Sequence, residues 1–397
     1  MSTDGELARV VRDHAGRLAG ALVSLLGDFS AAEDLVQDAV EIALKRWPVE
    51  GIPERPDAWL FTVAKHRGLD VLRRQQNYRA KLALLQPLEQ QPASDDRLRL
   101  IFTCCHPALA REAQVALTLR VVCGLTTAQI AAAFLASESA VAQRITRAKR
   151  KITDAGIPYR IPRDDELPDR LNEVLTVIYL LFNEGYLSST AECAHSCDLV
   201  DDAEWLTALL HGLLPNEPEV AGLLALIRLH RARTAARFTP AGDLILLEDQ
   251  DRTSWDHAAI ADATALLTRT ARRHHAPGPY QLQAAIAACH SEASTWPETD
   301  WPQILVLYDM LLTLQPTPVA GLHRSIALSY VRGPAAALAE LDGMATGLEQ
   351  YSLFHATRAQ LLRDLGRAAE AHDADERAAE LTANPAQLGL LNERLAR

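Results

Sequence analysis

The stretch at 124–151 constrains the fold of this chain more than any other, because it predicts two helices joined by a tight turn. Thr126 and Gln129 form a capping box that begins the first helix. A turn follows, and Ser137 or Ser139 is available as the N-cap of the second helix. Apolar residues recur at helical spacing in that second helix, at Val141, Ile145, Ala148 and Ile152. The pattern predicts one face that packs and another that is polar and cationic.

The polar face of the second predicted helix has the composition of a DNA-recognition helix. Glutamine and arginine side chains can hydrogen-bond base edges in the major groove, and later cations can contact phosphates. The candidate residues are Ser139, Gln143, Arg144, Arg147, Arg150 and Lys151. An ordinary amphipathic helix pair with a solvated basic face has the same spacing. The spacing alone favours neither interpretation, and the rest of the chain decides between them.

Length and composition favour several helical domains. A chain of 397 residues exceeds one typical hydrophobic core. Hydrophobic residues make up 48% of the chain but aromatic residues only 5%, and alanine and leucine are abundant while runs of valine and isoleucine are sparse, which favours an all-α fold. No apolar run has membrane-spanning length and no signal peptide is apparent. We therefore expect a cytoplasmic protein.

The net charge of −11 conceals a difference between the two parts of the chain. Residues 1–152 carry 21 Lys and Arg against 17 Asp and Glu, whereas residues 153–397 carry 19 against 34. A mildly basic front can meet nucleic acid, but phosphate would repel the acidic remainder unless its charge faces away. Protein partners or an intramolecular role suit the second part better.

The six cysteines predict neither a disulfide framework nor a metal site. Two clusters contain histidine, one at 193–197 and one at 104–106. Neither has the paired Cys-x-x-Cys spacing that is typical of zinc sites. We therefore expect reduced thiols buried in helices, and no metal.

The front of the chain predicts an acidic helix, a loop and a second helix whose end is cationic. Ser30 and Glu33 form a capping box for a helix that reaches Trp47. Three prolines and a glycine predict a loop at 48–56, and Asp57 then begins a second helix. The exposed side of the first helix presents Asp34, Gln37, Asp38 and Glu41.

Three motifs in this order and at these distances resemble regions 2 and 4 of the extracytoplasmic-function sigma factors of the sigma-70 family. They are the motif at 34–38, the motif at 56–74 with Trp59 and the Arg73-Arg74 pair, and the helix pair at 124–151. The resemblance covers residues 1–156. It implies a factor that binds core RNA polymerase, recognises promoter DNA at −10 and −35 elements and initiates transcription.

The resemblance also implies a task for each group of candidate residues. The face with Asp34, Gln37, Asp38 and Glu41 would dock on the polymerase clamp. The loop at 48–57 and the helix after it would contact the −10 element, through Trp59, Lys65, Arg67, Arg73 and Arg74. The helix at 139–151 would read the −35 element. Trp47 and Trp59 also suit apolar core positions, and His66 stands where many relatives have asparagine.

A long extension follows the sigma-like part. Its motifs at 182–186 and 248–252 resemble segments of a sigma subgroup that has a large C-terminal extension and often accompanies a small DGPF (YCII-like) protein. The candidate regulatory residues are Asn183, Glu184, Glu248, Asp249 and Asp251. Clustered carboxylates can also serve acid–base catalysis, but no nucleophile, phosphate-binding loop or metal triad accompanies them. We expect no enzyme activity and no cofactor.

A repeat of about 34 residues begins near Pro279 and is similar to tetratricopeptide helix pairs. Gly333 and Gly366 lie one period apart, and Pro316 and Pro385 lie near two periods apart. Such pairs stack because one pair cannot bury its apolar side alone, and the stack forms a groove for a peptide or a neighbouring domain. An ordinary helical bundle is the alternative.

These observations predict an all-α chain of six segments. They are sigma region 2 at 1–80, a linker at 81–96, sigma region 4 at 97–156, a linker at 157–169, a helical extension at 170–278 and tetratricopeptide-like repeats at 279–397. We expect the extension to regulate activity in place of a separate anti-sigma factor. The main alternative is a stand-alone helix-turn-helix regulator with a ligand- or protein-sensing helical domain. A second alternative is an enzyme fused to a DNA-binding module.

Overall fold

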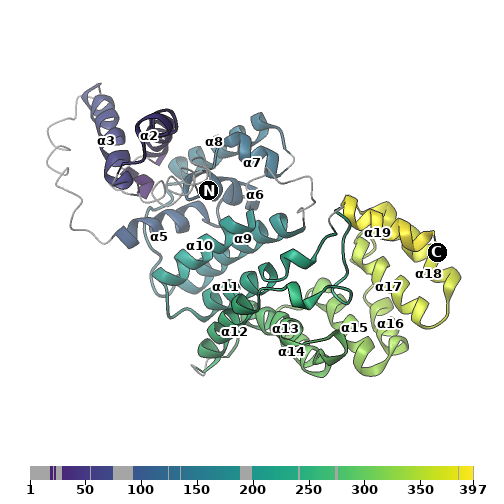
Figure 1. Cartoon of the computed structure of the whole chain (residues 1–397). Helices are drawn as coiled ribbons and strands as arrows, with labels where there is room; N and C mark the ends of the chain where they lie inside the picture. Colours follow the sequence, from purple (N-terminus) through teal and green to yellow (C-terminus); the bar gives the residue numbers. More distant parts are fainter. Residues whose placement is uncertain are drawn as a thin grey trace. The chain divides into compact units, whose positions relative to one another are not determined.

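The structure is a computed structural model, and it confirms the all-α expectation (Figure 1). It describes residues 18–20, 22–23, 29–53, 55–74, 93–123, 125–134, 136–187, 199–239, 242–272, 276–382 and 384–396. Within these ranges, the pairing between extended segments is a single bridge from Phe238 to Leu244. None of the described helices is both long and apolar enough to cross a membrane.

The chain divides into two compact units. Unit 1 comprises residues 1–185 and 196–206, and unit 2 comprises residues 186–195 and 207–397. The helices of unit 1 are α2 (Phe29–Glu50), α3 (Pro56–Arg74), α5 (Ala93–Cys104), α6 (Arg111–Val121), α7 (Thr127–Ala133), α8 (Glu138–Asp154) and α9 (Leu167–Leu187), whose last residues belong to unit 2. Helix α10 (Leu199–Leu213) begins in unit 1 and ends in unit 2.

Helices α2 and α3 pack against each other through an apolar face. Trp47 and Leu60 are among the most deeply buried side chains of this pair. The predicted loop began at Pro48, but α2 continues to Glu50. A proline in the last turn removes one hydrogen bond, and Gly51 then ends the helix in the left-handed region at φ +85°, with its N–H donating to the Trp47 carbonyl at 2.9 Å.

Helix α8 packs against α6 and α7, and α6 also packs against α5. This arrangement is the predicted helix-turn-helix. Helices α5 and α9 begin at Ala93 and Leu167, inside the two segments that the sequence predicted as linkers.

Helix α9 is held to α5 and α6 by its first turns. Arg170 donates to the Phe102 carbonyl at 2.6 Å, and its guanidinium lies 6.0 Å from the Phe102 ring centroid. Arg111 of α6 forms an ion pair with Glu173 at 2.7 Å. The start of the extension is therefore part of the same packed unit as the helix-turn-helix.

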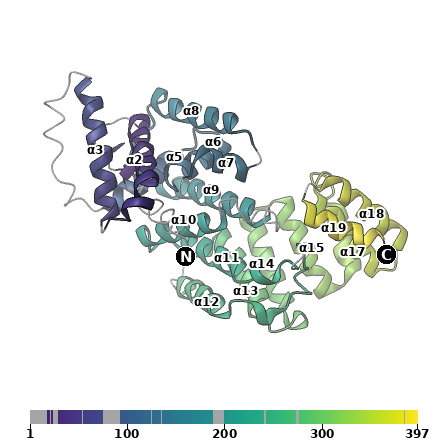
Figure 2. The same ribbon diagram turned by 45° about the horizontal axis from the view of Figure 1, so that its top comes forward.

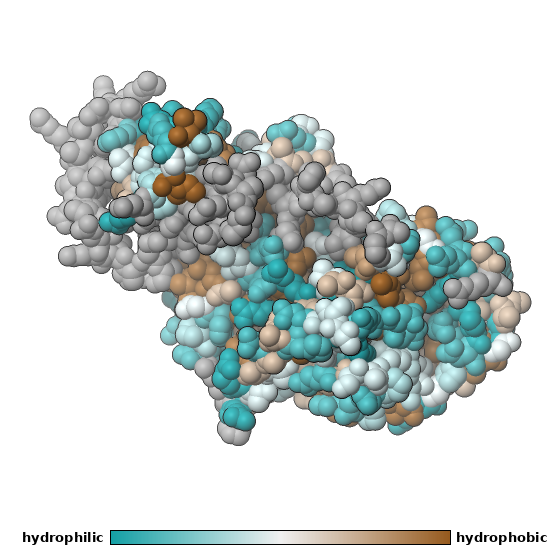
Figure 3. Space-filling model, viewed as in Figure 1, coloured by the Kyte–Doolittle hydropathy of each residue, from teal (hydrophilic) through white to brown (hydrophobic). Residues whose placement is uncertain are grey.

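Unit 2 is a succession of helices that pack mainly against their neighbours in the chain (Figures 1 and 2). They are α11 (Pro218–Arg231), α12 (His257–Ala271), α13 (Pro279–Glu292), α14 (Trp301–Leu314), α15 (Pro318–Arg332), α16 (Pro334–Gly343), α17 (Ser352–Asp364), α18 (Ala368–Leu381) and α19 (Pro385–Leu395), with 3₁₀ turns η3 (Thr234–Ala236), η4 (Arg252–Ser254) and η5 (Trp296–Glu298). The visible face of the described surface is mainly hydrophilic, with scattered hydrophobic residues (Figure 3).

The predicted 34-residue period reappears in the turns between paired helices. Gly333 separates α15 from α16, and Gly366 separates α17 from α18. Both glycines have positive φ, +86° and +73°, which other residues rarely adopt. The two helix pairs therefore turn at equivalent positions, as tetratricopeptide-like repeats require.

Candidate nucleic-acid interface

The buried stripe of α8 fixes the orientation of its polar face. Val141, Ile145, Ala148 and Ile152 are buried, as the sequence predicted. Ser137 is the N-cap, and its hydroxyl accepts from the Ala140 N–H at 3.2 Å. The Ser139 hydroxyl lies 3.2 Å from that of Ser137 at the beginning of the helix.

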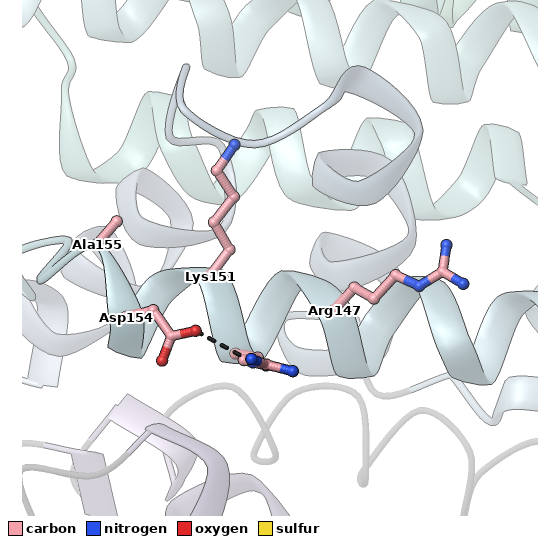
Figure 4. A pocket seen from close by; sticks show the side chains of 5 residues that line it. Arg147, Lys151, Asp154 and Ala155 are labelled. Atoms are coloured by element: carbon pink, nitrogen blue, oxygen red, sulfur yellow. Dashed lines mark hydrogen bonds and ion pairs between the residues drawn. The ribbon is translucent and has the colours of Figure 1, made fainter.

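The remaining candidates for −35 recognition lie on the outward side of α8. Gln143, Arg147 and Lys151 are exposed, and Arg144 is half-buried. Arg147 donates to the Gln143 side chain at 3.3 Å, which leaves most of its guanidinium donors available. In Figure 4, Arg147 and Lys151 extend from the helix beside a surface hollow. Such a face can meet a polyanion and also donate hydrogen bonds to base edges.

Two cations of α8 are engaged by carboxylates within unit 1. Arg150 pairs with Asp154 one turn later at 3.1 Å, drawn as a dashed line in Figure 4. Lys149, which is not among the candidates, lies with its Nζ 4.0 Å from an oxygen of Asp34 on α2. Its side chain is mostly buried. The charge available to DNA is therefore concentrated in Arg144, Arg147 and Lys151.

The acidic candidates lie along α2. Asp34 is 74% exposed and Glu41 is exposed, whereas Gln37 and Asp38 are half-buried. Asp38 accepts from Arg67 of α3 at 2.7 Å. This ion pair joins a residue of the predicted polymerase-binding face to a residue of the predicted −10 face. Neither partner is fully buried, so the pair contributes at most about 1 kcal/mol to stability.

The two tryptophans near the predicted −10 face have different environments. Trp47 is buried, as expected of a core residue, and Trp59 is half-buried. Their ring centroids lie 5.3 Å apart in an edge-to-face contact, which holds the Trp59 ring in place. Lys65, Arg73 and Arg74 belong to α3, but their side chains lie outside the described part.

The predicted regulatory residues lie on α9 and in the connection between α11 and α12. Asn183 and Glu184 are half-buried on α9, and Glu248 and Asp249 are exposed between α11 and α12. Asp251 caps η4, where it accepts from the N–H and the hydroxyl of Thr253 at 2.9 and 2.6 Å. These hydrogen bonds lower the pKa of Asp251. Asp251 thus has a local structural role.

Three arginines of unit 2 are buried, and none of them is among the candidate residues predicted from the sequence. Arg233, Arg237 and Arg252 are only 5%, 8% and 8% exposed. Arg237 donates to the Tyr186 carbonyl at 2.8 Å, and its guanidinium lies 3.6 Å from the Tyr186 ring centroid. Arg252 donates to the carbonyls of His290 and Ala293 at 2.7 and 2.6 Å. Cations at helix C-termini are favourable, so Arg237 and Arg252 stabilise the ends of α9 and α13.

His290 is a half-buried histidine beside this arginine cluster. Burial, together with the charges of Arg233 and Arg252, lowers the pKa of His290 to about 3. In the unfolded chain the imidazole of His290 binds a proton near pH 6.5, whereas in the folded chain it stays neutral at that pH. The contribution of His290 to the free energy of unfolding is therefore fully present above pH 6.5 and is lost as the pH decreases towards 3.

Acidification should therefore destabilise the protein, and His290→Gln should reduce that effect. A group with this shift lowers the free energy of unfolding by about 1.4 kcal/mol for each pH unit below 6.5, or by about 2 kcal/mol at pH 5. Urea unfolding at pH 7.5 and pH 5 measures the slope. The exposed His257 supplies the control, since His257→Gln should leave the slope at its wild-type value. Identical slopes in both variants would contradict the prediction.

Three of the four described cysteines are buried, and Cys289 is half-buried. Cys104, Cys105 and Cys123 are buried, and burial raises the pKa of Cys105 to about 12. The cluster at 193–197 lies outside the described residues. The described residues contain no group of three or more His, Cys, Asp or Glu side chains arranged to hold a metal ion.

Comparison with known proteins places three families along the chain. Sigma-70 region 2 matches residues 10–78, sigma-70 region 4 matches residues 99–152, and a family of unknown function, DUF6596, matches residues 170–271. An uncharacterized protein of Rhizobium meliloti (strain 1021) is 43% identical over 389 residues, which cover 95% of this chain and 92% of the relative. No solved structure matches.

Proposed function

Because this chain belongs to the sigma-70 family, as a sigma factor of extracytoplasmic-function type with a large C-terminal extension, we propose how its parts divide the work of transcription initiation. The family domains indicate a non-enzymatic transcription factor that binds core RNA polymerase and promoter DNA.

The two-sided character of α8 carries the proposal for the −35 element. One face of α8 is buried in unit 1, and the other presents Gln143, Arg144, Arg147 and Lys151. Arg144 would read a base edge, because its half-buried position at the middle of the helix restricts its side chain. Arg147 and Lys151 would contact phosphates and set the register of the helix on the duplex.

The acidic side of α2 would dock on core polymerase, and α3 would contact the −10 element. The exposure of Asp34 and Glu41 supports the docking role. The half-buried Trp59 has an aromatic face suited to an unpaired base, and cations on the same helix suit the backbone of a melted strand. The Asp38–Arg67 pair would keep the two surfaces in register.

The extension would control activity in the role that a separate anti-sigma factor has elsewhere. Its acidic composition supports a contact with the basic face of α8 in one state, and with polymerase or a regulatory protein in another. A DGPF (YCII-like) protein is the partner that the sequence resemblance suggests.

A truncation tests the control by the extension. The shortened chain should end after Leu187 and not after Gly156, since α9 is anchored to α5 and α6. In transcription with core polymerase, the truncated and full-length chains should differ at least tenfold in transcript yield. Equal yields, with equal binding of both chains to core polymerase, would contradict a regulatory extension.

A further inference from the structure

A cleft of about 800 Å³ lies within unit 2, between the segment at 244–249 and the C-terminal helices. The segment belongs to the connection between α11 and α12, which reaches α19 in Figure 1. The facing walls come from α17, α18 and α19. Such a volume is typical of sites that hold a ligand of drug size or a few residues of a peptide.

The lining of the cleft combines apolar side chains with an excess of carboxylates. Leu244, Leu246 and Leu390 supply apolar surface. The charged lining residues are Glu248, Asp249, Asp375, Glu393, Arg363 and Arg394. Arg363 is already paired with Asp375. Apolar walls beside uncompensated acids suit a long side chain with an apolar stem and a cationic head.

Asp375 has a buried oxygen that nothing in the described part of the chain satisfies. Its side chain is 1% exposed, and its Oδ2 accepts from Arg363. Its Oδ1 is buried and has no hydrogen-bond partner among the described residues. A buried carboxylate oxygen without a donor is costly, and a donor from a bound cation would remove that cost.

We propose that this cleft binds an extended basic segment of a partner protein, with a lysine or arginine side chain directed at Asp375. The stem of that side chain would pack on the leucines, and Glu248 and Asp249 would attract the flanking positive charge. The acidic lining disfavours a nucleic acid. Glu248 and Asp249, which belong to the motif at 248–252, would thus bind a protein partner and take no part in promoter recognition.

A defined peptide pair tests the site on the full-length protein. The probe is a fluorescein-labelled heptapeptide of alternating alanine and lysine, and the control peptide has glutamate in place of lysine. Fluorescence anisotropy at 0.1 M salt should show binding of the lysine peptide alone. Equal binding of both peptides, or no binding of the lysine peptide at 1 mM, would overturn the proposal.

A matched pair of charge reversals locates the binding. Glu248→Lys lies in the cleft, whereas Asp373→Lys introduces the same change of charge at an exposed position of α18 that does not line it. Glu248→Lys should lower the affinity for the lysine peptide at least tenfold, and Asp373→Lys should lower it less than twofold. Equal weakening would show attraction to net charge alone and would overturn the site.

The neutral variant Asp375→Asn tests the buried oxygen. It should lower the affinity for the lysine peptide at least tenfold while the far-ultraviolet circular dichroism spectrum stays unchanged. Unchanged affinity would exclude Asp375 as the anchor. If this variant unfolds, Glu248→Lys still decides the proposal, because Glu248 is exposed and substitutions at exposed positions usually change stability little.

Discussion

Alanine at Arg144 lowers the affinity of the polymerase holoenzyme for its promoter by about 1–3 kcal/mol, roughly five- to 150-fold, if this residue reads a base. The loss should be confined to promoters that carry the preferred base, because a wrong base already lacks the contact. Binding of the holoenzyme to promoter fragments that differ at single −35 positions measures it. A uniform loss across all fragments would show that Arg144 contacts phosphate.

The neighbouring cations of α8 provide the comparison. Arg147→Ala should weaken all promoters alike and reduce the slope of log affinity against log salt by about 0.9. Arg150→Ala should have a smaller effect, because Asp154 already holds that guanidinium. If Arg150→Ala has the largest effect of the three, the proposed assignment of this face is wrong.

Asp38→Arg abolishes transcription in our account, because it places a cation on the face that docks on core polymerase. The same change also breaks the ion pair with Arg67, so a structural explanation has to be separated from a docking one. Asp38→Arg combined with Arg67→Asp restores an internal pair with its charges exchanged. Co-purification with core polymerase and transcript yield report on the two variants.

The charge exchange distinguishes the two roles. If Asp38 docks on polymerase, the double variant stays as inactive as Asp38→Arg although its thermal midpoint recovers. If Asp38 serves only to hold α2 against α3, the double variant regains transcription, and the docking assignment fails. Glu50→Arg supplies a control on α2, since Glu50 is exposed at the end of the helix outside the acidic candidates.

The sequence could predict the features that depend on local periodicity. The four apolar positions of α8 recur at helical spacing. The N-cap is equally local, because the Ser137 hydroxyl accepts from the N–H of Ala140, three residues later. The repeat glycines could be found for a similar reason, since Gly333 and Gly366 both have positive φ between two helices of a pair. Local pattern therefore suffices for helix faces and their ends.

The sequence could not predict features that join distant parts of the chain. Arg67 reaches Asp38 across 29 positions, and Arg237 reaches the Tyr186 carbonyl across 51. Arginine is rarely buried, so composition argues against such positions until the helix ends that they cap are known. Pro48 shows the opposite error, because proline signals a loop while α2 continues through it to Glu50.

The most direct test of the central claim is transcription in vitro with core RNA polymerase, from a template whose −10 and −35 elements can be replaced one at a time. Our account predicts transcripts only when the core enzyme and this chain are both present, and their loss when either element is replaced. Protection of a duplex operator by the chain alone, without core binding or transcripts, would contradict it and would establish a stand-alone regulator.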